Sequence, residues 1–162
     1  MMRIRRYRVG EEDVLRQICR DTTLRMNVDE YGSELVEKWA AKLGNASKWK
    51  NRLREANPLV AECDGELVGF AELSDSGRIG ALYSHHDWLG RGVGKALYDA
   101  IESEASRRGM TTIEVDTSFG ASGFFRANGF RIMEERVVLT DGIPSKSLLM
   151  EKRLGKIDAR PT

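Results

Sequence analysis

The sequence predicts a mixed α/β domain in which a mostly antiparallel sheet with one parallel step is flanked by helices. Two Asp-Gly turns lie between apolar runs, at Asp64-Gly65 and within residues 141–144, and each predicts an antiparallel hairpin. Between these hairpins an apolar strand leads through a glycine-rich turn into a long amphipathic helix and then a further strand, over residues 78–117. A helical crossover of this kind joins two parallel strands.

The first third of the chain carries one strand signal followed by helical signals. Residues 3–7 alternate as a strand, and the acids of residues 11–13 open a helix. Ser33 is the expected N-cap of a second helix that ends near Gly44, and residues 45–55 predict a third. The side chains expected to face inward are Val14, Leu15, Ile18 and Cys19, then Leu35, Val36, Trp39 and Leu43, then Trp49 and Leu53.

Pro58 marks the change from helical to strand periodicity. The strands expected after it are residues 59–63, 67–73, 78–83 and 112–117, with a closing hairpin of 130–140 and 147–153. The long helix starts at Val93 and stops at Arg107-Arg108-Gly109, and a short helix covers residues 121–128. Residues 1–154 are expected to form a single domain, and the polar residues 155–162 a frayed tail.

Composition narrows the classes of partner. The 162-residue chain has 26 Lys and Arg against 25 Asp and Glu, so it has no general attraction for nucleic acid or an anionic membrane. It carries neither a run of membrane-spanning length nor the apolar core of a signal peptide, which favours a cytoplasmic protein. Cys19 and Cys63 fit buried thiols in a reducing compartment, and His85 with His86 cannot make a zinc site alone, so no metal is expected.

The turn before the long helix has the form of a phosphate-binding loop, because a glycine-rich turn lets an anion approach the free N–H groups of a helix start. A loop without ligand is the alternative. The nucleotide P-loop pattern fails, because Leu89 and Ala96 stand where it needs glycine and a hydroxyl. The dinucleotide fingerprint fails as well, because Lys95 stands in place of its third glycine.

Three segments together resemble the GNAT superfamily of N-acetyltransferases, which bind acetyl-coenzyme A. Gly92 and Gly94 match the family's pyrophosphate loop, with Leu89 where glutamine or arginine is usual. Residues 121–130, Ala-x-x-Phe-Phe-x-x-x-Gly-Phe, resemble the family's Ala-x-x-Phe-Tyr-x-x-x-Gly-Phe segment, and residues 149–154 resemble its last strand. The resemblance runs from about residue 3 to 154 and implies the GNAT acyl-coenzyme A N-acyltransferase fold.

The resemblance implies acetyl-coenzyme A as co-substrate and a cofactor site around the glycine-rich loop. Backbone N–H groups of residues 89–95 would cradle the pyrophosphate, and Arg91 and Lys95 would add charge. The edge of the strand at residues 82–84 would pair with pantetheine, in a gap opened by a bulge in that strand. The implied cofactor-binding residues are Leu82, Tyr83, Ser84, Leu89, Gly90, Arg91, Gly92, Val93, Gly94, Lys95 and Phe124.

The candidates for acid–base catalysis lie outside the family's usual positions. The family's acid tyrosine falls at Phe125 and the glutamate that some members use falls at Arg78. The remaining candidates for catalysis are Asp116, Ser118 and Tyr83, with a water relayed to Asp116 as the preferred base; a solvated strand-face acid is the alternative for Asp116. Glu72 and His85 are further candidates, although His85 is expected to brace the loop.

The acceptor implied by the resemblance is a primary amine, on a small molecule or a protein, attacking the thioester directly in a ternary complex. Tyr31 and Trp39 are expected in the wall of the acceptor site; Arg78 would favour an anionic acceptor if it points inward and is otherwise a surface residue. Family members often form dimers, so the resemblance is compatible with a homodimer. The alternative functions are a coenzyme A-binding sensor without turnover and an acyltransferase for another acyl chain.

Overall fold

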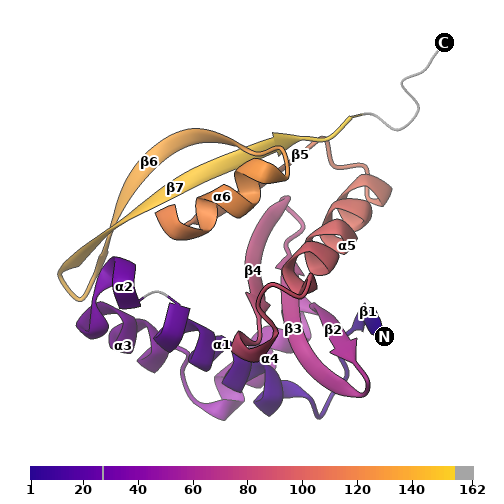
Figure 1. Ribbon diagram of the computed structural model, residues 1–162, viewed down its shortest axis with the longest axis horizontal. Helices are drawn as coiled ribbons and strands as arrows, with labels where there is room; N and C mark the ends of the chain where they lie inside the picture. The colour runs from indigo at the N-terminus through magenta and orange to yellow at the C-terminus, as the bar shows by residue number, and fades with distance from the viewer. Residues whose placement is uncertain (27, 156–162) are drawn as a thin grey trace.

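The computed structural model describes residues 1–26 and 28–155, and these residues form one seven-stranded sheet (Figure 1). The strand order is β1-β2-β3-β4-β5-β7-β6, and every neighbouring pair is antiparallel except β4 and β5. The strands are β1 (Met2–Arg6), β2 (Leu59–Cys63), β3 (Glu66–Leu73), β4 (Arg78–Ser84), β5 (Thr112–Thr117), β6 (Arg131–Thr140) and β7 (Ile143–Arg153). The predicted fold class is therefore confirmed.

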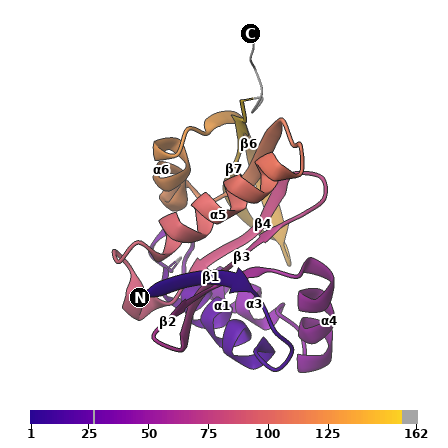
Figure 2. The same cartoon turned by 90° about the vertical axis from the view of Figure 1, so that its right-hand side faces the viewer.

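Helices cover both faces of the sheet. Figure 2 shows α5 on one side of strands β1 to β4, with α1 and α4 on the other. The helices are α1 (Glu12–Met26), α2 (Val28–Tyr31), α3 (Ser33–Ala41), α4 (Ala46–Ala56), the short 3₁₀ helix η1 (His86–Trp88), α5 (Val93–Arg107) and α6 (Phe119–Ala127). On β2, Ala61 packs in the core under α5 while Val60 packs in the core under α1 and α4, because successive side chains of a strand point to opposite faces.

Both predicted Asp-Gly turns are present. Asp64 and Gly65 have φ of 51° and 84°, and Asp141 and Gly142 have φ of 49° and 83°. Two consecutive positive φ values match the right-handed twist of hairpin strands, so two residues suffice to reverse the chain. The second turn is therefore shorter than the predicted 141–144, and β7 already begins at Ile143.

The first third of the chain differs from the prediction in three places. Gly32, with φ of 83°, takes the N-cap position of α3, so Ser33 is its first helical residue and caps nothing. The four-residue helix α2 was not predicted, because one turn is too short to show a 3.6-residue period. Val14 was expected to face inward but is 48% exposed, whereas Leu15 of the same helix is fully buried.

The parallel step between β4 and β5 is brief, and the strands then separate. Only Arg78 with Glu114 and Ile79 with Val115 are in register; later residues of both strands form no such pair within the part of the chain that the structure describes. Opposite β3, the register of β4 slips so that Gly80 is an extra residue between Ile79 and Ala81. This β-bulge bends β4 and so favours its separation from β5. The gap and bulge implied by the resemblance are both present.

Among the described residues, no helix combines the length and the apolar character needed to cross a bilayer. Of the tail predicted to fray, residues 156–162 lie outside the described residues.

Candidate active site

A cavity of about 610 Å³ occupies the gap between β4 and β5. Its floor follows β4 through Gly80 to Ser84 and β5 from Val115 to Thr117. Its walls come from α1, α2, α3, α5 and α6 and from the hairpin of β6 and β7. Residues far apart in the sequence, from α1 to β7, therefore meet where β4 and β5 separate.

The cavity collects most of the residues that the sequence singled out, and leaves some aside. The predicted site residues that line it are Leu82, Tyr83, Ser84, Leu89, Gly94, Asp116, Ser118, Phe124, Tyr31 and Trp39. Among the described residues, the predicted site residues that do not line it are Gly90, Arg91 and Gly92 of the loop beside it, Val93 and Lys95 in the first turn of α5, and Arg78 of β4.

The loop between η1 and α5 ends in a helix start with free donors. Gly92, with φ of 83°, is the N-cap of α5, and the first amide bonded back to it is that of Ala96, at 3.0 Å from the Gly92 carbonyl oxygen. Within the described residues, no acceptor pairs with the N–H groups of Val93, Gly94 and Lys95. Free amides at a positive helix end are a binding site for phosphate.

Two cationic side chains lie at this loop, and each already has a partner within the protein. The Arg91 guanidinium lies over the Trp88 ring, 4.9 Å from its centroid. Lys95 Nζ lies 2.8 Å from both Asp99 and Asn128 Oδ1, and so ties the start of α5 to the end of α6. Both side chains keep positive charge beside the free amides, where it favours an anion.

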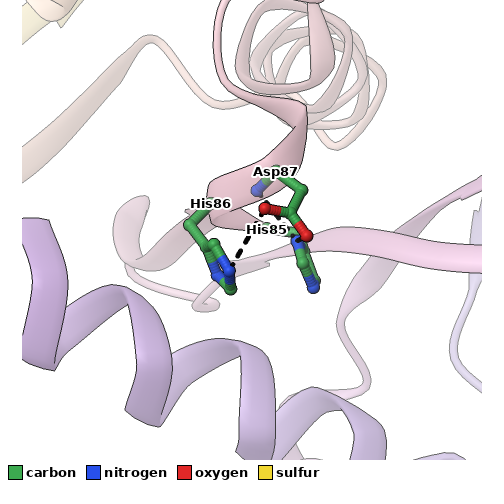
Figure 3. Close-up of side chains that lie close together, drawn as sticks. All are labelled: His85, His86 and Asp87. Atoms are coloured by element: carbon green, nitrogen blue, oxygen red, sulfur yellow. Dashed lines mark hydrogen bonds and ion pairs between the residues drawn. The ribbon is translucent and has the colours of Figure 1, made fainter.

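The residues before the loop form a small cluster of their own (Figure 3). His85 Nδ1 accepts a hydrogen bond from the Asp87 backbone N–H at 3.0 Å and so caps η1. The His86 ring stacks on His85 at 4.5 Å, and its Nε2 lies 3.3 Å from Asp87 Oδ1. The geometry gives His85 the bracing position expected for it, at the turn that leads into the loop.

Tyr83 presents a half-buried phenol to the side of β4 that faces α1. Burial raises the pKa of this phenol well above its ordinary value of 10, and the neighbouring Cys19 thiol acts in the same direction. Tyr83 therefore stays a neutral hydroxyl at physiological pH and can donate a hydrogen bond. Burial also raises the pKa of the Cys19 thiol, so Cys19 is not a ready nucleophile.

Asp116 lies at the open end of β5 with both carboxylate oxygens occupied. Ser147 Oγ donates to Oδ1 at 3.0 Å, and Arg136 Nη1 lies 3.2 Å from Oδ2. Arg78 Nη1 is 3.9 Å from the same oxygen, and its Nη2 pairs with Glu114 at 3.0 Å, at the closed end of the strand pair. Arg136 and Ser147 were not found from the sequence, because nothing local signals a pairing across 20 or 31 residues.

Helix α6 closes the cavity with aromatic side chains and no hydroxyl. Ser118 caps it, its Oγ accepting from the Ala121 N–H at 3.1 Å, so α6 starts two residues earlier than predicted. Phe125 is 4% exposed, and Phe124 lies edge-on to Tyr98 at 6.2 Å. Phe125, at the position of the family's acid tyrosine, therefore contributes packing but no proton donor.

The opposite wall comes from α2 and α3, held against the hairpin of β6 and β7. The Tyr31 hydroxyl donates to the Lys146 carbonyl at 3.0 Å, and Trp39 Nε1 donates to Thr140 Oγ1 at 3.0 Å. The Tyr31 and Trp39 rings meet edge-on at 4.9 Å. Thr22 and Thr23 of α1 also line the cavity; they begin the segment of about residues 22–46 that the resemblance assigns to the acceptor, but neither was singled out, since two threonines in a helix carry no sequence signal.

A splayed parallel strand pair beside a helix start with free amides defines the architecture of acetyl-coenzyme A-binding acyltransferases. The family model described as an acetyltransferase (GNAT) domain matches residues 27–154, and this chain belongs to the GNAT acetyltransferase family. No curated protein sequence matches the chain.

Solved structures agree with this assignment. A GCN5-related N-acetyltransferase from Rhodopseudomonas palustris shares 32% identity at a TM-score of 0.89, covering 94% of this chain and 95% of that one. The PaiA N-acetyltransferase of Thermoplasma acidophilum, in complex with coenzyme A, shares 22% identity (TM-score 0.77; 95% and 99% covered). A phosphinothricin acetyltransferase of Sinorhizobium meliloti, in complex with acetyl-coenzyme A, shares 17% (TM-score 0.76; 99% and 93% covered). The last two likenesses concern the fold.

Proposed function

We propose that the chain is an acetyl-coenzyme A-dependent N-acetyltransferase that moves the acetyl group to a primary amine by direct attack in a ternary complex. The observation that carries the proposal is the continuity of the cavity: it runs from the glycine-rich start of α5 along the unpaired part of β4 to the bulge at Gly80. A long, bent thioester fits such a path, with its anionic end at the helix and its acyl end at the bulge.

In this proposal the cofactor is held chiefly by backbone groups. The free amides of residues 93–95 would bind the pyrophosphate, and the edge of β4 at residues 82–84 would pair with the pantetheine amides as an added strand. Phe124 would pack against the thioester arm from α6. Leu89, in the place of a polar side chain, leaves these backbone contacts intact.

The proposed reaction forms one bond and breaks one. The amine nitrogen attacks the thioester carbonyl, the C–N bond forms, and the C–S bond breaks as the negative charge moves to sulfur. An N–H of β4 near residue 82 would stabilise the developing oxyanion, and the neutral Tyr83 hydroxyl would protonate the thiolate. Asp116, with Ser118 beside it, stays the candidate on β5 to receive the amine's proton through water.

The acceptor is proposed to enter between the aromatic wall of Tyr31 and Trp39 and the hairpin of β6 and β7. An aromatic wall suits an acceptor with apolar or planar groups beside its amine. Arg78 is turned to Glu114, so we assign it no role toward an anionic acceptor.

The test measures consumption of acetyl-coenzyme A through the release of its free thiol. The amines offered are free amino acids, polyamines, amino sugars and a peptide with a free N-terminus. We expect saturable turnover with at least one amine. Calorimetric binding of acetyl-coenzyme A without turnover of any amine would favour a sensor, and faster turnover of propionyl- or longer acyl-coenzyme A would favour another acyl chain. A protein that binds no acyl-coenzyme A would overturn the proposal.

A further inference from the structure

The chain between β4 and the loop that opens α5 carries three consecutive metal-ligating side chains, His85, His86 and Asp87 (Figure 3). None of the three lines the cavity between β4 and β5, and the proposed acetyl transfer uses none of them. Each offers one donor atom, two imidazole nitrogens and a carboxylate oxygen, and the three donors lie within 4.8 Å of one another. The cluster is therefore a second place in the molecule where chemistry-bearing groups converge.

The distances within this cluster are close to those that a single metal ion imposes. His86 Nε2 lies 3.3 Å from Asp87 Oδ1, and His85 Nδ1 lies 4.0 Å from Asp87 Oδ2. Nitrogen and oxygen ligands lie about 2.0–2.2 Å from Zn²⁺, which puts two ligands of one ion about 3–3.5 Å apart. The two rings stack with 21° between their planes, and histidine χ2 has a broad preference, so the ring nitrogens can turn toward a common point at low cost.

The surroundings of each side chain show which atom is available to an ion. His86 Nδ1 is buried and has no hydrogen-bond partner among the described residues, so Nε2, which faces Asp87, is the nitrogen that an ion from solvent can reach. His85 Nδ1 accepts from the Asp87 backbone N–H, so an ion at this atom would replace one hydrogen bond by a metal bond. The Asp87 carboxylate pairs with the two histidines and, within the part of the chain that the structure describes, with no lysine or arginine.

The backbone under the cluster is fixed, while the side chains reach solvent. The His85 N–H donates to the Val68 carbonyl at 2.7 Å, and the Trp88 N–H donates to the His85 carbonyl at 2.8 Å. The side chains of His85 and His86 are 25% and 20% exposed, and that of Asp87 is 73% exposed. An ion can therefore enter from solvent, and donors on a fixed backbone lose little freedom when they bind it.

We propose that His85, His86 and Asp87 bind one Zn²⁺ ion, with water as the fourth ligand. The two histidines alone cannot complete such a site, and the Asp87 carboxylate supplies the third protein ligand. Imidazole nitrogen suits Zn²⁺, whereas Mg²⁺ and Ca²⁺ prefer oxygen ligands. The ion would join the N-cap of η1 to the helix itself, directly before the loop, and would stabilise this turn in the folded protein.

The test titrates the tag-free chain, freed of metal by a chelator, with Zn²⁺ in a calorimeter. We expect one ion to bind with a dissociation constant of about 10 µM or tighter, and Mg²⁺ to give no binding signal. Asp87→Asn and His86→Asn should each weaken Zn²⁺ binding by about tenfold or more. Asp75→Asn is the matched control, because it removes an exposed carboxylate from the turn between β3 and β4, and it should bind Zn²⁺ like the wild type.

Cys63 is the rival zinc ligand, because its thiol is free and only half-buried. Cys63→Ser is expected to keep the wild-type Zn²⁺ affinity. Thermal unfolding without metal checks that each variant folds, and Zn²⁺ should then raise the Tm of the wild type and of Asp75→Asn but not of Asp87→Asn. The inference fails if the wild type binds no Zn²⁺, if Mg²⁺ binds as tightly, if Asp87→Asn and His86→Asn keep the wild-type affinity, or if Cys63→Ser loses it.

Discussion

Gly92 joins the cofactor loop to α5 through a backbone conformation that side chains rarely adopt. Its φ of 83° turns the chain so that the amides of residues 93–95 face out of the helix start. No atom lies within 4 Å of where its Cβ would be, so the space above the glycine is open. In the proposed complex that space belongs to the pyrophosphate.

Gly92→Asp is therefore expected to abolish coenzyme A binding. The carboxylate would occupy the anion's place and repel it, and losing two charge-assisted hydrogen bonds lowers affinity by about 100-fold or more. Gly109→Asp is the matched control, because Gly109 has φ of 76° and open space at the other end of the same helix. Calorimetry measures both variants. Micromolar affinity retained in Gly92→Asp would contradict a backbone-built pyrophosphate site.

Phe125 and Tyr83 are the two residues that decide which proton donor the cavity offers. Phe125 supplies no hydroxyl from α6, whereas the Tyr83 phenol lines the cavity as a neutral donor. A thiol is a good leaving group and needs a modest acid, while an ammonium acceptor cannot attack until it has lost a proton. The proton acceptor therefore matters more to this site than the donor.

At the scale of elements, two segments far apart in the chain form the acceptor side. The α2–α3 segment reaches the hairpin of β6 and β7 through Tyr31 and Trp39, and Lys38 and Lys42 both lie 3.6 Å from Asp141 at the hairpin turn. Figure 1 shows α2 and α3 beside the tip of this hairpin. Their contact closes the cavity on the side away from the cofactor loop.

Trp39→Phe is expected to weaken acceptor binding and to leave the cofactor site unchanged. The variant keeps an aromatic wall but loses the hydrogen bond to Thr140, which is worth about 1 kcal/mol, so the acceptor KM should rise about fivefold. Trp49→Phe is the control: it loses a similar bond, from Nε1 to the Glu12 carbonyl at 2.8 Å, in a core away from the cavity. Equal acceptor KM values in the two variants would refute a role for this wall.

At the scale of the whole molecule, the local signals of the sequence predict the elements but not the contacts across the gap. Asp64-Gly65 fixes its hairpin within the turn itself, and Leu15, Trp49 and Leu53 are buried as their spacing predicts. The cofactor loop is likewise one continuous stretch, so it could be read directly. In contrast, Trp39 and Thr140 are 101 positions apart in the sequence, and the folded sheet brings them together without any local signal.

Glu72 illustrates the same limit. Its orientation depends on the register of β3 against β4, and the bulge at Gly80 shifts that register by one residue. A one-residue slip moves a side chain to the opposite face, so no local pattern decides whether a strand carboxylate faces the core or solvent. Only the folded sheet places it beside the bulge.

The junction of β1 with α1 holds a buried carboxylate that contributes to how the fold responds to acid. Glu12 is 3% exposed; the Tyr7 hydroxyl donates to its Oε2 at 3.0 Å, and the Gly10 N–H lies 3.1 Å from both oxygens. Burial is the largest influence on the pKa of Glu12 and acts to raise it. The hydrogen bonds from Gly10 and Tyr7 outweigh burial and lower that pKa below its ordinary 4.5.

Because the folded protein binds this proton less readily than the unfolded chain, Glu12 stabilises the fold fully above pH 4.5. That stabilisation is lost as pH falls through the lowered pKa. Glu12→Gln is expected to reduce the free energy of unfolding at pH 7 by about 1–3 kcal/mol and to flatten its decline below pH 4.5, measured by urea unfolding. Glu66→Gln, at an exposed carboxylate that begins β3, should leave both unchanged. An equally steep acid decline in Glu12→Gln would assign the acid sensitivity to other carboxylates.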